Sequence, residues 1–104
     1  MTLLKLFLAA LLETGGDALV RLGLKAPAPS AKFGLLTAGA VVLFLYGVFV
    51  NTPAWDFGKL LGVYVVLFFV VAQLVSWLVF HQPPSRTTLI GGAFIIAGGA
   101  IVSL

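Results

Sequence analysis

Four long apolar runs separated by short breaks dominate the chain and leave little choice of fold. They cover residues 2–24, 33–50, 57–80 and 86–104. The last run is apolar only from Leu89, and residues 86–88 are included because the run is otherwise short for a membrane span. A helix needs roughly 17–25 mostly apolar residues to cross a ~30 Å hydrocarbon core. Each run is close to that length. The sequence therefore predicts an all-α integral membrane protein, with residues 1–104 forming a single four-helix domain.

Charged residues are too few to coat a surface that faces water. The chain has six Lys and Arg and three Asp and Glu, which is 9% of its 104 residues, and 62% are hydrophobic. A soluble domain is typically about 25% charged. The expected surroundings are therefore membrane lipids. The six cations are scattered between apolar runs and form no basic stripe, so nucleic acid is not an expected partner.

Prolines mark the breaks between the apolar runs. They fall in residues 25–30 (KAPAPS), 51–53 (NTP) and 82–85 (QPPS). A proline has no backbone N–H to donate, and it biases the residue before it away from helical geometry. Each segment should therefore be a short loop between two closely spaced helices.

Glu13 is the acidic residue expected deepest inside an apolar run. An ionisable side chain there costs a few kcal/mol and almost always faces a bundle interior or a watery cavity. A low dielectric disfavours the charged carboxylate, so such a group can exchange a proton for a cation. The alternative is a buried Glu that only hydrogen-bonds for helix packing. We favour a proton- and substrate-binding role.

Asp17 and Arg21 follow Glu13 at successive spacings of four residues. With about 3.6 residues per helical turn, all three side chains share one face. Two interpretations stay open. Asp17 and Arg21 could form an ion pair near the headgroups, with Arg21 snorkelling toward them. Alternatively, they could form a polar track that leads from Glu13 to the mouth of a cavity.

Small residues predict where helices approach one another closely. Gly15 and Gly16 would allow close contact with the first helix. In the last run, two pairs of glycines seven residues apart each return to one face after two turns. These residues are Gly91, Gly92, Gly98 and Gly99. They could pack within one chain, but four short helices enclose little space, which favours a seam between protomers of a dimer.

Other polar residues in the apolar runs carry less information. Tyr64 and Gln73 in the third run could hydrogen-bond a neighbouring helix or line a cavity. Any of the nine phenylalanines could line an apolar chamber, although each more often faces lipid. His81 is expected to be solvated at a helix end, with no metal role.

Enzyme signatures are missing from the sequence. It has no cysteine, nucleophile elbow, phosphate-binding glycine loop with Lys, His-rich cluster or paired catalytic carboxylates. The glycine clusters lie inside apolar runs, where a nucleotide site is not expected. The sequence therefore predicts no enzyme activity, cofactor or metal site.

The residues around Glu13 and in the last run resemble the small multidrug resistance proteins of the drug/metabolite transporter superfamily. That family has a Glu in an apolar–Glu–small–small context, as in residues 10–16 (ALLETGG), and paired small residues seven apart in its fourth helix. Residues 76–82 followed by 89–98 look like its passage from third to fourth helix. Thr52-Pro53, Gly58-Lys59 and residues 62–65 (GVYV) are closer to the YnfA-like branch.

The resemblance implies a proton-coupled exporter in a bacterial inner membrane. Such exporters are usually antiparallel homodimers, with one first-helix Glu per protomer facing a shared chamber. Drug-exporting members carry aromatic residues in their second and third helices. For these positions this chain offers Tyr46, Tyr64 and Trp77, although Trp77 lies too near the end of its run to be their central tryptophan. Asp17 and Arg21 are not part of the exporters' pattern.

Three functions remain open at this point. The first is proton-coupled efflux of small cationic or lipophilic compounds, with Glu13 exchanging proton for substrate and Tyr46 and Tyr64 shaping the chamber. The second is a lipid-carrier flippase or facilitator, in which Arg21 and Arg86 meet a phosphate headgroup. The third is a non-transporting subunit or scaffold that packs against another membrane protein.

Overall fold

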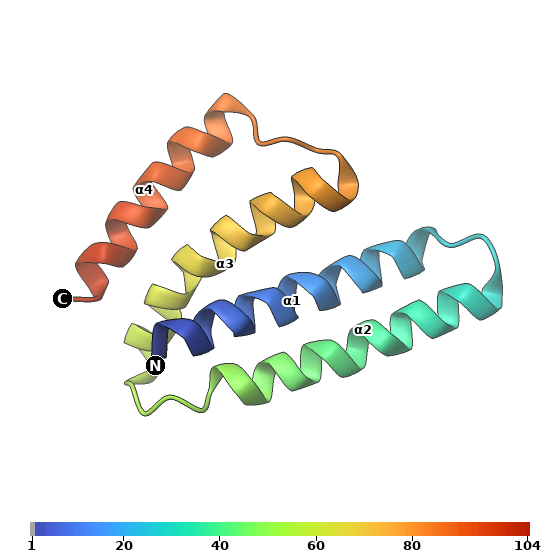
Figure 1. Ribbon diagram of the computed structural model, residues 1–104, viewed down its shortest axis with the longest axis horizontal. Helices are drawn as coiled ribbons and strands as arrows, with labels where there is room; N and C mark the ends of the chain where they lie inside the picture. The colour runs from blue at the N-terminus through green and yellow to red at the C-terminus, as the bar shows by residue number, and fades with distance from the viewer. Residues whose placement is uncertain (1) are drawn as a thin grey trace.

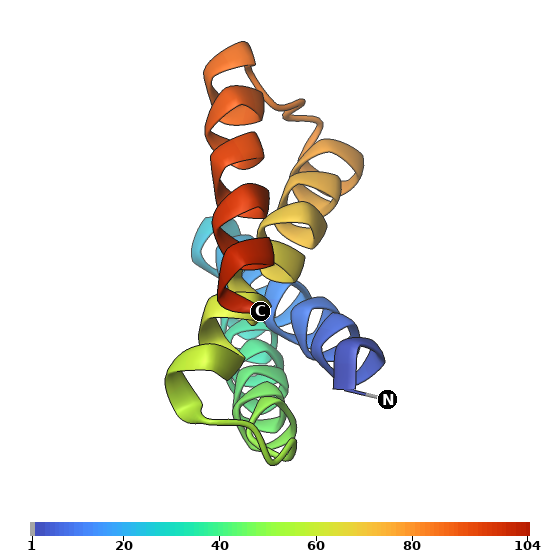
Figure 2. The same cartoon turned by 90° about the vertical axis from the view of Figure 1, so that its left-hand side faces the viewer.

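The computed structural model describes residues 2–104, which form four helices and, in that range, no strand (Figure 1). The helices are α1 (Thr2–Lys25), α2 (Pro29–Val50), α3 (Phe57–Phe80) and α4 (Arg86–Val102). The predicted all-α, four-helix chain is confirmed. The α1 N-terminus and the α4 C-terminus lie at the same end of the molecule, as an even number of antiparallel passes requires (Figures 1 and 2).

The helix α2 begins earlier than the sequence pattern predicted. The expected run starts at Phe33, whereas the helix starts at Pro29. Proline is tolerated in the first turn of a helix because its missing N–H would have no intrahelical acceptor there. Lys32 reaches back and donates a hydrogen bond from Nζ to the Leu24 carbonyl oxygen at 3.0 Å. That contact places a cation on a free carbonyl at the end of α1, where the helix dipole favours positive charge.

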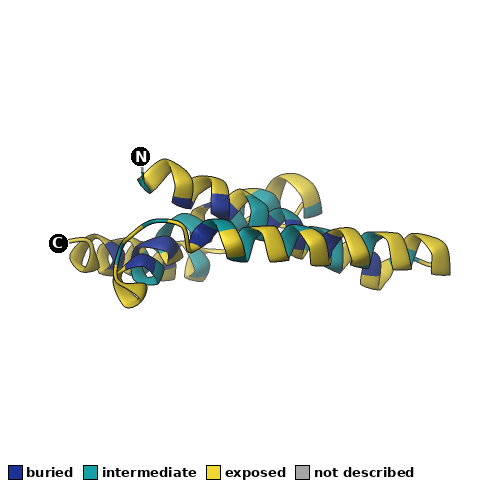
Figure 3. Cartoon of the chain, turned by 90° about the horizontal axis from the view of Figure 1, so that it is seen from below, coloured by how far each residue is buried: buried dark blue, intermediate teal, exposed yellow. Residues whose placement is uncertain are grey.

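The helices form a thin layer in which α1 lies between α2 and α3. The helix α1 packs against α2 and α3, and among the described helices α4 packs against α3 alone (Figure 1). The chain measures 48 × 35 × 18 Å, and its thinness is clear from below (Figure 3). Because one helix with side chains is about 10–12 Å wide, most helix faces have no neighbour within the chain.

Glycine permits the close contact between α1 and α2. A Cβ atom at position 39 would lie 3.0 Å from the Gly16 carbonyl oxygen and 3.1 Å from the Val20 backbone nitrogen. A Cβ at position 16 would lie 2.7 Å from Leu43 Cγ. The predicted close approach is therefore confirmed at Gly16. At Gly15 an added Cβ would meet nothing within 4 Å in the described chain.

A small side chain also lies where α1 meets α3. Leu6 and Ala10 are fully buried, in one cluster with Leu60 and Tyr64 of α3 and Val50 of α2. Alanine lets two helix backbones approach closely, and close packing is a main driving force for helix association in lipid. This contact lies near the N-terminal ends of both helices, and the two helices diverge toward their C-terminal ends (Figure 1).

The exterior of the chain is strongly apolar. Exposed large side chains occur on every helix, among them Phe33, Phe44, Leu78 and Phe94 (Figure 3). The helices α2 and α3 are long and apolar enough to cross a membrane. The helix α4 is apolar but has 17 residues, and α1 has 24 residues but carries several charges.

We predict that Gly39→Ala and Gly47→Ala, both in α2, have opposite effects on stability. At position 39 the added methyl group overpacks the contact with α1, which costs roughly 1–3 kcal/mol of unfolding free energy. At position 47 the Cβ would meet nothing within 4 Å in the described chain, so alanine's higher helix propensity should add up to about 1 kcal/mol. The unfolding free energies of the two variants and the wild type can be compared by following helicity with circular dichroism during titration from mild detergent into SDS. Equal effects would contradict the observed contact between α1 and α2.

Candidate functional site

Glu13 lies midway along α1 and is hydrogen-bonded to another helix. The Tyr64 hydroxyl of α3 donates to Glu13 Oε1 at 2.8 Å. Tyr64 is only 4% exposed, whereas Glu13 is half-buried. The two residues are 51 positions apart in sequence, so folding alone brings them together. The predicted hydrogen-bonding role of Tyr64 therefore has a defined partner.

Tyr46 extends the cluster to a third helix. Its ring stacks on the Tyr64 ring, with centroids 5.8 Å apart and planes inclined by 29°. The Phe68 ring lies one turn further along α3, 6.1 Å from Tyr64. Glu13, Tyr46 and Tyr64 thus form an acid–tyrosine cluster where α1, α2 and α3 meet. These are the three residues that the sequence singled out for proton and substrate binding.

The acid–tyrosine cluster places a carboxylate against aromatic rings. One phenol hydroxyl holds one carboxylate oxygen, and no ion pair within 4.0 Å reaches Glu13 from any residue in 2–104. A carboxylate surrounded by aromatic rings in an apolar chain needs a compensating positive charge or a proton. The faces of aromatic rings attract cations. The cluster therefore combines two kinds of group that attract positive charge, a carboxylate and aromatic ring faces.

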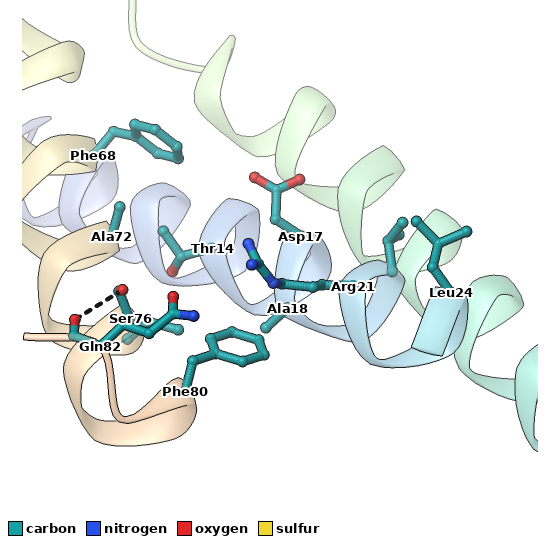
Figure 4. Close-up of a pocket in the computed structure, with 12 residues that line it drawn as sticks. Thr14, Asp17, Ala18, Arg21, Leu24, Phe68, Ala72, Ser76, Phe80 and Gln82 are labelled. Atoms are coloured by element: carbon teal, nitrogen blue, oxygen red, sulfur yellow. Dashed lines mark hydrogen bonds between the residues drawn. The ribbon is translucent and has the colours of Figure 1, made fainter. Parts of the chain in front are cut away.

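A cavity lies next to the cluster, where α1 and α3 diverge. Its volume is about 320 Å³, and both helices contribute lining residues (Figure 4). The polar residues that line it are Thr14, Asp17, Arg21, Ser76 and Gln82. Phe68 borders both features, since it lines the cavity and also contacts the Tyr64 ring. The cavity therefore begins one side chain away from the acid–tyrosine cluster.

Asp17 and Arg21 both line this cavity without pairing with each other. The Arg21 guanidinium lies over the Phe80 ring of α3, 5.3 Å from its centroid. In Figure 4 the Arg21 guanidinium is drawn beside the Asp17 carboxylate, and no hydrogen bond joins the two side chains. A hydrogen-bonded pair, one of the two interpretations of the sequence, is therefore not formed. The other, a polar track leading from Glu13, stays a prediction.

The four glycines of α4 divide between two faces. Gly92 and Gly99 are buried against α3, where an added Cβ would collide with Phe69 and Val66 respectively. At Gly91 and Gly98 an added Cβ would meet nothing within 4 Å in the described chain. Packing within the chain thus accounts for one pair. The other pair stays on an open face, where its role in a dimer remains a prediction.

Some residues of the cavity had little or no signal in the sequence. Phe80 is one of nine phenylalanines, and nothing in its local sequence marks it as the partner of Arg21. Gln82 follows the end of α3 and lines the cavity because the chain turns back there. His81 caps α3 in the left-handed conformation at φ 56°, and the Gln82 N–H donates to the Ser76 carbonyl oxygen at 2.9 Å. Within residues 2–104, no three metal-binding side chains come together.

Comparison with known proteins identifies the chain's relatives. A family model described as "Uncharacterised BCR, YnfA/UPF0060 family" matches residues 1–104. The chain belongs to the YnfA/UPF0060 family. A UPF0060 membrane protein of Herpetosiphon aurantiacus is 35% identical over 97 residues, covering 91% of this chain and 86% of that protein. One from Bacillus subtilis is 33% identical over 103 residues, covering 98% and 92%. No solved structure matches the chain.

Membership in the YnfA/UPF0060 family confirms part of the resemblance seen in the sequence. The segments that pointed to the YnfA-like branch belong to a chain that the family model matches from end to end. Its relatives are named membrane proteins and come from bacteria. The apolar exterior and the two long apolar helices of this YnfA/UPF0060 protein agree with those names.

We predict that Glu13 and Tyr64 are energetically coupled. Tyr64→Phe removes the donor of the 2.8 Å hydrogen bond and keeps the ring, and Glu13→Ala removes the acceptor. A double-mutant cycle on unfolding free energy in detergent should give a coupling of roughly 1 kcal/mol, the scale of a hydrogen bond within a membrane protein. Additive single effects would show that the hydrogen bond contributes nothing to stability.

Proposed function

We propose that this YnfA/UPF0060 protein is a proton-coupled exporter of small cationic, lipophilic compounds in the bacterial inner membrane. All four helices would cross the bilayer, and two chains would form the working unit. The observation that carries the proposal is the Glu13 carboxylate, which accepts the Tyr64 hydrogen bond at the junction of three helices. An acid is costly in an apolar helix, and helix packing alone does not need one, whereas the exchange of a proton for a cation does.

The exchange follows from charge compensation. When Glu13 is protonated, the site is neutral and has no strong attraction for a cation. When the proton leaves, the carboxylate attracts an organic cation, and the Tyr46 and Tyr64 rings offer their faces to it. Binding of one species therefore disfavours binding of the other, which is the coupling that an antiporter needs.

The open layer of helices supports a dimer. A chain 18 Å thick encloses little space of its own, and α4 contacts only α3 among the described helices. The free Gly91 and Gly98 face of α4 would allow a second copy to approach closely. The resemblance to the small multidrug resistance proteins favours a homodimer with antiparallel protomers. In such a dimer two acid–tyrosine clusters could face one chamber.

A second function is favoured by one feature of the cavity. Arg21 lines a mostly apolar space that could take the headgroup of a lipid carrier, since Arg binds phosphate through paired hydrogen bonds. In a lipid-carrier flippase, loss of Arg21 would impair function more than loss of Glu13. A scaffold or subunit without transport would tolerate both losses when its partner is present.

We expect purified protein in detergent to release protons when small organic cations are added, and the Glu13→Gln variant to release none. The amide keeps the shape of the side chain but cannot lose a proton at neutral pH. The readout is a pH-sensitive dye in weakly buffered solution, across a panel of quaternary ammonium and guanidinium compounds.

Asp56→Asn is the matched control, because Asp56 is an exposed acid that precedes α3 and lies outside the cluster. That variant should release protons as the wild type does. Equal release from Glu13→Gln and wild type, or no release by folded wild type across the panel, would exclude the proposed exchange.

A further inference from the structure

The cavity between α1 and α3 is lined by an acid and a base that are not hydrogen-bonded to each other. Asp17 and Arg21 line it from the same helix, four residues apart. The Arg21 guanidinium lies over the Phe80 ring, and no ion pair within 4.0 Å involves Asp17 anywhere in residues 2–104. Glu13 is not among the residues that line this cavity. These two charges are therefore separate from the proposed exchange site.

Their spacing defines which ligand would satisfy both charges. Residues four apart on a helix have Cβ atoms about 6 Å apart. Both side chains are exposed and lie beside apolar surface, and an opposite charge that binds either of them would add a charge-assisted hydrogen bond. A cation would pair with Asp17 and leave Arg21 unchanged, and an anion would do the reverse. A molecule that carries an ammonium group and an anionic group on a short linker can pair with both.

We propose that this cavity binds a small amphipathic zwitterion, with its ammonium group at Asp17, its anionic group at Arg21 and its apolar body against Phe68 and Phe80. Carboxylate and phosphate oxygens both suit the forked donors of a guanidinium. The inference goes beyond the proposed efflux function and does not rest on it.

The size and walls of the cavity agree with such a ligand. Its volume of about 320 Å³ is at the low end of the usual 300–1,000 Å³ for small-molecule sites. Its remaining walls are apolar, formed by Ala18, Val20, Leu24, Ala72 and Val75. Thr14 and Ser76 already donate their hydroxyl groups to the carbonyl oxygens of Ala10 and Gln82. Asp17 and Arg21 therefore provide most of the polar recognition.

This ligand chemistry has two natural sources. One is a free amino acid with an apolar side chain, and the other is the headgroup of a zwitterionic phospholipid. The cavity lies toward the C-terminal ends of α1 and α3, with Leu24 and Gln82 among its lining residues. Helix ends in membrane proteins lie near the headgroups, where both sources are present.

Calorimetric titration of the wild-type protein in maltoside detergent at neutral pH tests the proposal. The zwitterionic probes are L-phenylalanine and dihexanoylphosphatidylethanolamine. Their single-charge analogues are 2-phenylethylamine, 3-phenylpropanoate and dihexanoylphosphatidylglycerol. At least one zwitterion should bind about tenfold more tightly than its analogues, because each analogue forfeits a charged hydrogen bond. Binding of phenylalanine alone would identify a free zwitterion as ligand, and binding of the lipid alone would identify a headgroup.

Two variants test the assignment of residues. Asp17→Asn and Arg21→Gln should each weaken binding of the preferred zwitterion about tenfold, whereas Asp56→Asn, at an exposed acid outside the cavity, should leave it unchanged. Far-UV circular dichroism checks that each variant is folded. Failure of both zwitterions to bind, or analogues that bind as tightly, would overturn the proposal. Neither measurement uses proton release, so failure here is distinct from failure of the exchange at Glu13.

Discussion

The close packing of α1 against two neighbours is the contact on which the rest of this structure depends. Ala10 lies in the buried cluster with Leu60 and Tyr64 of α3, and Gly16 meets α2 near Gly39. In a lipid environment the hydrophobic effect does not drive one apolar helix onto another, so association relies on close approach and on hydrogen bonds. Small residues on two faces of α1 supply the close approach. Glu13 lies between these contacts and is therefore held within reach of α2 and α3.

The same packing explains why the two polar features are neighbours and yet distinct. Near Ala10, α1 and α3 are close, and the Tyr64 hydroxyl can reach Glu13. Further along, the helices diverge around the side chains of Phe68 and Phe80, and a cavity opens beside Asp17 and Arg21. One face of α1 thus carries a hydrogen-bonded acid and, about one and two turns later, two charges that line open space. Glu13, midway along its helix, is the most costly of the three in lipid, and membrane proteins rarely keep such an acid without a use for it.

The thin layer of helices bears on how the YnfA/UPF0060 family could work. Most helix faces meet no other helix within the chain, so lipid or a second copy must cover them. The helix α4 uses Gly92 and Gly99 to pack on α3 and leaves Gly91 and Gly98 free. The two glycine pairs of α4 therefore differ in their surroundings. One pair packs against α3, and the other lies on a face that has no neighbour in the described chain.

Much of this protein was determined by the sequence alone, because membrane insertion depends on local properties. Apolar runs of sufficient length with prolines between them predicted the four helices, and the surroundings of Glu13 marked it as the central acid. Helix starts were less predictable, as at Pro29, where proline belongs to the first turn. Only the tertiary structure decided the partners: Tyr64 for Glu13, Phe80 for Arg21, and α3 for one glycine pair of α4. Those contacts join residues far apart in the chain. They depend on how the helices rotate and diverge, which the apolar pattern of a lipid-facing helix leaves open because lipid and protein interior are almost equally apolar.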